Sequence, residues 1–107
     1  MTLTFREYEQ QAKKTRQFNH PDAITYCVLG LAGESGEVAD KRKKQLRGDE
    51  HAPSNEDIKK EVGDLLWYVA MLADALGTNL EEVARANLDK IQSRQQRGVI
   101  KSSGDER

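Results

Sequence analysis

The sequence has 107 residues, enough for one domain with its own hydrophobic core. Charged residues make up 33% of it and the formal net charge is −1, which excludes a general attraction to nucleic acid or to an anionic membrane. No signal peptide is visible, and no apolar run approaches the roughly 20 residues of a membrane span. The only cysteine, Cys27, cannot form an internal disulfide. We therefore expect a cytoplasmic protein with no membrane or nucleic-acid partner.

Helical periodicity and capping signals predict two helices in the first half of the chain. The first is expected over residues 4–18, with Thr4 as its N-cap and Glu7 reaching back to it. Pro21 interrupts the pattern and favours the first turn of a second helix over about residues 22–46. The expected core stripe of this second helix consists of Ile24, Cys27, Val28, Leu31, Ser35 and Val38.

Two further helices are predicted in the second half. A loop over residues 47–55 leads to a third helix that a serine cap opens and that runs to about residue 76. Gly77 ends it, and Asn79 caps a fourth helix that fades around residues 95–98. Four helices with one apolar stripe each predict an all-α, four-helix bundle. The third helix is apolar nearly all round, which points to a subunit interface in so short a chain.

Two pairs of carboxylates flank these apolar stripes. Glu34 and Glu37 lie three residues apart in the second helix, and Glu61 and Asp64 repeat that spacing in the third. Residues three apart share a helical face, so each pair can aim both carboxylates at one point. Antiparallel packing of the two helices would bring four hard oxygen donors together, a set that suits Mg²⁺ or Mn²⁺ and that repels itself without a cation. The alternative is a chance spacing on solvated faces among 18 acidic residues.

Three glycines surround the first acidic pair. In a helix interior Gly30, Gly33 and Gly36 each cost about 1 kcal/mol relative to alanine. We expect this loss to be offset by the close approach of another backbone or of a bulky ligand.

The pattern Glu34-x-x-Glu37 followed by Glu61-x-x-Asp64 resembles the signature of the MazG-like, all-α nucleoside triphosphate pyrophosphatases. The similarity continues through residues 65–70 and 80–90. It implies a Mg²⁺-dependent enzyme that converts a nucleoside triphosphate into the monophosphate and pyrophosphate and so clears noncanonical or excess nucleotides. It also implies a tight dimer, often paired into a tetramer, with the active site beside the subunit interface. A single domain over residues 1–98 and a flexible tail over 99–107 are then expected.

The resemblance assigns roles to individual residues. All four carboxylates are expected to be metal ligands in the catalytic site, although either Glu34 or Glu37 is also suited to orient or deprotonate the water. Lys41 and Lys44 follow on the same flank and are candidate phosphate ligands; the alternative is a solvated basic face. The other candidate substrate contacts are Tyr68, Asn87, Lys90 and Arg94.

Two other functions remain open. One is a phosphoribosyl-ATP pyrophosphatase, which resembles this superfamily, and the other is a non-catalytic helical dimer that binds nucleotides or a partner protein. Trp67 is suited either to stack on a base or to pack in an interface. Cys27 reads as a small core residue rather than a nucleophile.

Overall fold

The computed structural model describes residues 2–17, 19–99 and 104. It contains the helices α1 (Phe5–Lys13), α2 (Ala23–Arg47), α3 (Asn55–Ala75) and α4 (Leu80–Arg97), and no strand within the described residues. The prediction of an all-α chain with four helices is therefore confirmed. The expected flexible tail lies almost entirely outside the part of the chain that is described. None of the described helices combines the length and the hydropathy that crossing a bilayer requires.

Side chains that the sequence marks as caps close the helix ends. The Ser54 hydroxyl accepts a hydrogen bond from the backbone N–H of Asp57 (3.1 Å), and the Asp57 carboxylate accepts one from the backbone N–H of Ser54 (2.9 Å). This reciprocal pair satisfies two donors that the first turn of a helix leaves unpaired. Gly48 and Gly98 end α2 and α4 with φ of 75° and 73°, a left-handed conformation that favours glycine.

Helix α1 ends at Lys13, earlier than the predicted residue 18. The chain tightens there because the Thr15 hydroxyl donates to the carbonyl of Ala12 (2.7 Å). The same hydroxyl accepts a hydrogen bond from the indole N–H of Trp67 in α3 (2.9 Å). Trp67 thus holds the end of α1 against α3. This role differs from the two that the sequence suggested, which were stacking on a base and packing in an interface.

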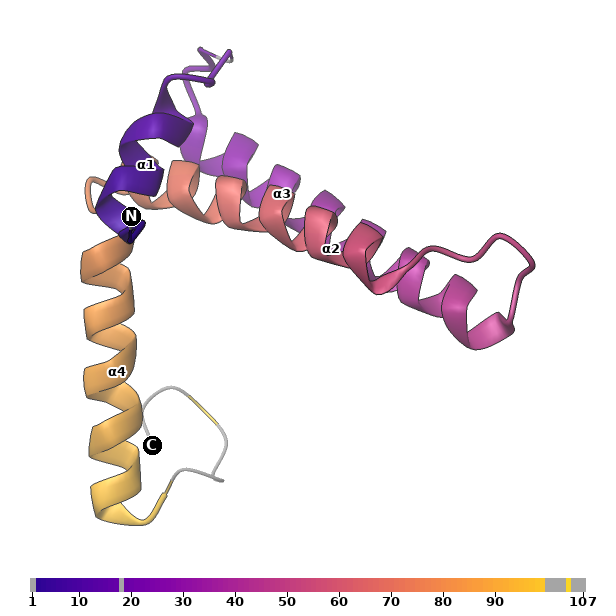
Figure 1. Ribbon diagram of the computed structural model, residues 1–107. Helices are drawn as coiled ribbons and strands as arrows, with labels where there is room; N and C mark the ends of the chain where they lie inside the picture. Colours follow the sequence, from indigo (N-terminus) through magenta and orange to yellow (C-terminus); the bar gives the residue numbers. More distant parts are fainter. Residues whose placement is uncertain (1, 18, 100–103, 105–107) are drawn as a thin grey trace.

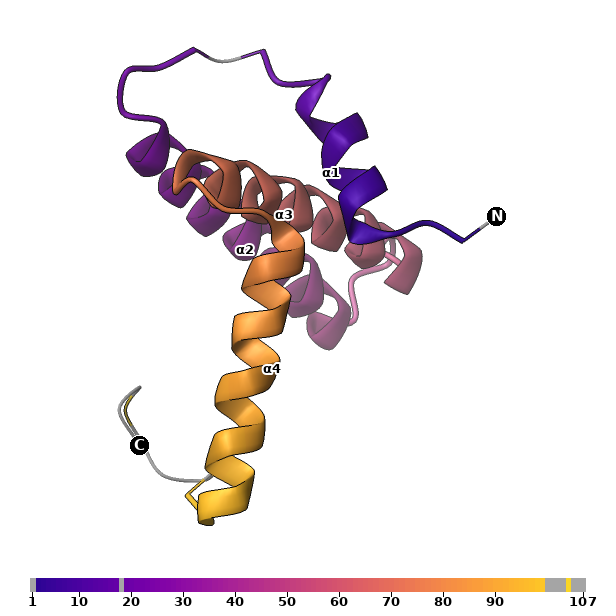
Figure 2. The same cartoon turned by 90° about the vertical axis from the view of Figure 1, so that its left-hand side faces the viewer.

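The four helices form an antiparallel hairpin with two additions. Helices α2 and α3 lie side by side along their length, and α1 lies across one end of this hairpin (Figures 1 and 2). Ion pairs from Asp74 to Lys13 (3.0 Å) and Arg16 (3.5 Å) fasten α1 to α3. The cluster of buried apolar side chains sits at this end and includes Ala12, Cys27, Ala70, Met71 and Leu80.

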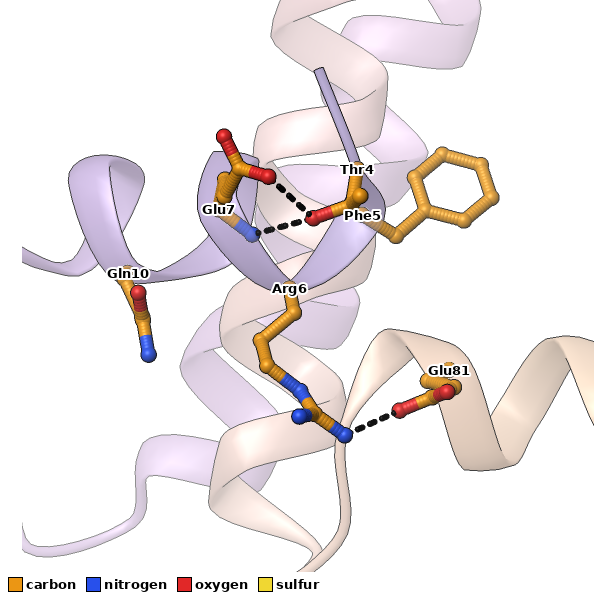
Figure 3. A pocket seen from close by; sticks show the side chains of 6 residues that line it. All are labelled: Thr4, Phe5, Arg6, Glu7, Gln10 and Glu81. Atoms are coloured by element: carbon orange, nitrogen blue, oxygen red, sulfur yellow. Dashed lines mark hydrogen bonds and ion pairs between the residues drawn. The ribbon is translucent and has the colours of Figure 1, made fainter. Parts of the chain in front are cut away.

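Helix α4 leaves the hairpin and touches α1 and α3 but not α2 among the described residues (Figure 1). Its start is held by the buried carboxylate of Glu9, which accepts a hydrogen bond from the backbone N–H of Leu80 (3.3 Å). Arg6 adds an ion pair with Glu81 (2.7 Å) across the shallow cavity drawn in Figure 3. These two contacts hold the first turn of α4 against α1.

Much of the expected core is exposed in this arrangement. Ile24, Val28 and Val62, assigned to core stripes from the sequence, are 44%, 47% and 48% exposed. One side of the hairpin has no helix of its own chain over it, which is why the stripe is only half covered. The radius of gyration is accordingly 16.8 Å, against about 13 Å for a compact chain of this length.

The three glycines of α2 have different surroundings. A Cβ at Gly30 would lie 2.1 Å from the Tyr68 ring, so Gly30 provides the space into which that ring packs. Gly33 and Gly36 have nothing within 4 Å of such a Cβ. A close approach is therefore found at Gly30, where it comes from a tyrosine side chain and not from the expected backbone or ligand.

The two environments predict opposite effects of alanine on thermal stability. Gly30→Ala should lower the melting temperature, because displacing a packed ring costs about 1–3 kcal/mol. Gly33→Ala should raise it, because alanine gains up to about 1 kcal/mol in a helix interior. Thermal unfolding followed by circular dichroism measures both. Equal gains for the two variants would contradict the packing of Tyr68 on Gly30.

Candidate metal centre

Helices α2 and α3 bring carboxylates from distant parts of the sequence to one point. Glu34 from α2 and Glu61 and Asp64 from α3 each place one oxygen so that these atoms lie within 4.8 Å of one another. The antiparallel packing of two helices thus brings together three of the four carboxylates whose convergence the paired spacing predicted. Three carboxylate oxygens this close form a ligand set for a hard cation.

Two of the oxygens face inward. Oε2 of Glu34 and Oε2 of Glu61 are sealed from solvent and have no hydrogen-bond partner among the described residues. A buried carboxylate oxygen without a partner is costly, and a bound cation is one way to satisfy it. The residues therefore fit Mg²⁺ or Mn²⁺, both of which prefer oxygen ligands.

Glu37 extends the cluster toward the next turn of α2. Hydrogen bonding with Glu61 and repulsion by its charge raise the pKa of Glu37 above the usual range of a glutamate. The pKa of Glu34 is raised as well, first by burial and then by the charges of Glu37 and Asp64. Without a cation, Glu34 and Glu37 therefore hold their protons more tightly than isolated glutamates would, as expected for mutual repulsion.

The predicted phosphate ligands differ in where they point. The Lys41 ammonium pairs with Oε1 of Glu61 on the neighbouring helix (3.5 Å). Lys44 pairs with Asp40 within α2 (2.9 Å), on a more exposed part of the surface. Lys41 belongs to the cluster in this structure, and Lys44 does not contact it.

Two tyrosines border the cluster. Tyr68 packs on Gly30, and burial followed by the nearby Tyr26 and Glu34 raises the pKa of its phenol. Tyr8 of α1 was not predicted as a site residue, yet burial and the charge of Asp64 raise its phenol pKa too. Its place on the apolar stripe of α1 was visible in the sequence, but the crossing of α1 over α3 was not.

The candidate contacts on α4 lie apart from the carboxylates of their own chain. Asn87 and Lys90 line a cavity of about 360 Å³ together with Val83 and Ala86. Helix α4 does not contact α2 within the described residues and points away from the α2–α3 hairpin (Figure 1), so one chain does not bring the later turns of α4 to the cluster. Arg94, a surface residue by its sequence pattern alone, is buried, with 6% of its surface exposed.

A family model described as the MazG nucleotide pyrophosphohydrolase domain matches residues 23–99. The chain belongs to this family. The match spans α2, α3 and α4 and so includes all four carboxylates. The chain is also 46% identical over 89 residues to the "Gene 37 protein" of Mycobacterium phage L5, which covers 80% of this chain and 78% of that protein. No solved structure matches the chain.

Repulsion in the cluster predicts the pH dependence of the metal-free MazG domain. A pKa of Glu34 raised above 4.5 means that the folded chain binds this proton more tightly than the unfolded chain. Stability is therefore lost as the pH rises above about 4.5, and the loss is complete once the pH exceeds the raised value. Glu34→Gln removes the charge and with it this loss.

In a chelator at neutral pH, Glu34→Gln should melt a few degrees above the unchanged protein. The difference should disappear near pH 4, where the glutamate is protonated in both the folded and the unfolded chain. Thermal melts across this pH range, with Glu50→Gln in the exposed loop as control, measure the effect. An advantage that persists undiminished at low pH would contradict electrostatic repulsion as its source.

Proposed function

We propose that this MazG domain is a Mg²⁺-dependent nucleoside triphosphate pyrophosphohydrolase that converts a ribo- or deoxyribonucleoside triphosphate into the monophosphate and pyrophosphate. The observation that carries the proposal is the approach of Glu34, Glu61 and Asp64 to within 4.8 Å, with two sealed oxygens that lack partners among the described residues. Such a cluster opposes folding unless it holds a cation. We propose that the enzyme acts in the cytoplasm and removes noncanonical or excess nucleotides by hydrolysis. The free, buried thiol of Cys27 is compatible with a reducing compartment.

The reaction adds water across the anhydride between the α- and β-phosphates. The hydroxyl goes to one phosphorus and a proton leaves, so the products are a monophosphate and pyrophosphate. We assign Glu34, Glu37, Glu61 and Asp64 to hold the metal, with Glu34 or Glu37 suited instead to orient or deprotonate the water. Bound Mg²⁺ would supply charge neutralisation for the triphosphate.

Other residues of the chain contribute position and charge. We assign Lys41 to the phosphates because it already reaches the cluster, at 3.5 Å from Glu61. Tyr68, held against Gly30 beside Glu34, is placed to contact the sugar. Lys44 is a weaker candidate for a phosphate ligand than Lys41, because it pairs with Asp40 on its own helix and does not reach the cluster.

We further propose that two copies pair and that α4 of one copy serves the carboxylates of the other. The open shape and the exposed side chains of α4 support this: Val83, Leu88 and Ile91 are 40%, 55% and 37% exposed. A second copy would cover this surface and the bare side of the hairpin. It would also bring Asn87, Lys90 and Arg94 of α4 toward a site from which their own chain keeps them apart.

Turnover tests the catalytic assignment. With Mg²⁺ and a panel of nucleoside triphosphates that includes phosphoribosyl-ATP, we expect release of pyrophosphate from at least one nucleoside triphosphate. Glu61→Gln and Asp64→Asn should each lower kcat at least about a hundredfold, because charge stabilisation of the transition state is lost. Coupled detection of pyrophosphate measures the rate, and circular dichroism checks that helicity is kept.

Each other outcome of this assay selects a different function. Turnover of phosphoribosyl-ATP alone would favour a phosphoribosyl-ATP pyrophosphatase. Metal binding without turnover of any member of the panel would favour a nucleotide- or partner-binding dimer. Full activity in both carboxylate variants would overturn the assignment of the site.

Solution mass tests the pairing. We expect a dimer or a tetramer by light scattering coupled to gel filtration, and Ile91→Glu should weaken it roughly tenfold or more by burying a charge in the interface. Gln96→Glu, at a position about 140° around the axis of α4 from Ile91, serves as the matched control and should keep the assembly. A monomer at micromolar concentration in the unchanged protein would refute the pairing.

A further inference from the structure

One cation of the chain is paired with the carboxylate cluster from across the two helices. Lys41 lies one helical turn beyond Glu37 on α2, and its ammonium reaches Oε1 of Glu61 on α3 at 3.5 Å. The side chains are 28% and 15% exposed, so the pair is half-buried and less screened than a surface pair. The ammonium supplies positive charge at the place where carboxylates crowd.

The neighbouring lysines show that this pairing is not a general property of the basic end of α2. Lys43 and Lys44 both pair with Asp40 within the helix, at 3.4 and 2.9 Å. Asp40 is 45% exposed, and exposed pairs of this kind contribute little to stability. Lys41 alone of these three lysines turns from its own helix to the cluster.

The two oxygens of Glu61 have different surroundings. Oε1 faces Lys41, and Oε2 is sealed from solvent and has no hydrogen-bond partner in the described part of the chain. Lys41 therefore neutralises Glu61 from outside and leaves the inner oxygen to another ligand. A lysine so placed lowers the negative potential that a divalent cation meets, and it raises the attraction for a triphosphate.

We propose that Lys41 is a built-in counter-ion of the cluster: it neutralises Glu61 while no metal is bound, and it turns to the phosphates of the substrate once a divalent cation has entered. This rests on the proposed metal site. The substrate and the cluster then compete for one ammonium, which couples metal binding to nucleotide binding. By linkage, each ligand must strengthen the binding of the other by the same factor.

The coupling gives Lys41→Met a signature of two opposite effects. Without nucleotide the variant should bind Mn²⁺ more tightly, on the order of tenfold, since a positive charge a few ångströms from the ion is removed. With Mn²⁺ present it should bind a non-hydrolysable triphosphate analogue more weakly by a similar factor. Electron paramagnetic resonance of free Mn²⁺ gives the first affinity, and calorimetry gives the second.

Three variants make the measurement specific. Lys43→Met removes the same charge from the same helix and should leave the Mn²⁺ affinity within about twofold, because its exposed partner is screened. Lys41→Arg keeps the charge, and in the absence of nucleotide it should bind Mn²⁺ with an affinity close to that of the unchanged protein. Lys41→Gln repeats the neutral change with a polar side chain if the methionine variant folds poorly.

The outcomes separate this inference from the function on which it rests. Tighter Mn²⁺ binding together with weaker analogue binding supports the counter-ion. Normal Mn²⁺ binding by the unchanged protein, with equal or weaker binding by Lys41→Met, overturns the counter-ion alone; weaker binding would make Lys41 an orienting partner of Glu61. Absence of Mn²⁺ binding in the unchanged protein overturns the metal site and the counter-ion with it.

Discussion

Repulsion among carboxylates at the contact of α2 and α3 is the constraint on which the rest of this structure depends. The two helices lie side by side along their length, so Glu34, Glu61 and Asp64 cannot separate without opening the hairpin. The apolar core that holds the hairpin together sits at one end of it, around Met71 and Cys27. The free energy gained by packing at this end thus offsets the repulsion among the carboxylates in the middle of the hairpin. The fold can therefore hold the carboxylates close together before a ligand binds.

Local features of this chain were predictable from its sequence, because a few neighbouring residues determine them. The caps at Thr4, Ser54 and Asn79 and the stop at Gly77 are where the pattern put them. The meeting of the acidic pairs followed from helical spacing and one assumption about antiparallel packing. The end of α1 at Lys13 did not follow, because the Thr15 contact with Trp67 depends on how α1 crosses α3. No local pattern encodes that crossing.

The mismatch between the apolar stripes and the covered surface has a physical meaning. Helical period marked Ile24, Val28 and Val62 as core, and all three are more than 40% exposed. Evolution of a sequence responds to the assembled state, whereas the fold of one chain can bury only what its own helices reach. The same reasoning applies to Asn87 and Lys90, which one chain leaves on a helix that never touches α2 within the described residues. The proposed pairing of two copies would account for both observations, because a second copy would cover the apolar side chains that one chain leaves exposed.

The register of α2 orders the site in space. Gly30, Glu34, Glu37 and Lys41 follow one another at spacings of four, three and four residues, so they lie on a single stripe of the helix. Along this stripe come the Tyr68 ring over Gly30, then the carboxylates, then the ammonium on Glu61. A nucleoside triphosphate has the same order of chemistry, from a ring system through a metal-binding phosphate to a terminal negative charge. We infer that the substrate lies along α2 with its nucleoside toward Tyr68 and its last phosphates toward Lys41. In this arrangement Gly30 and Lys41 mark the two ends of the inferred binding site.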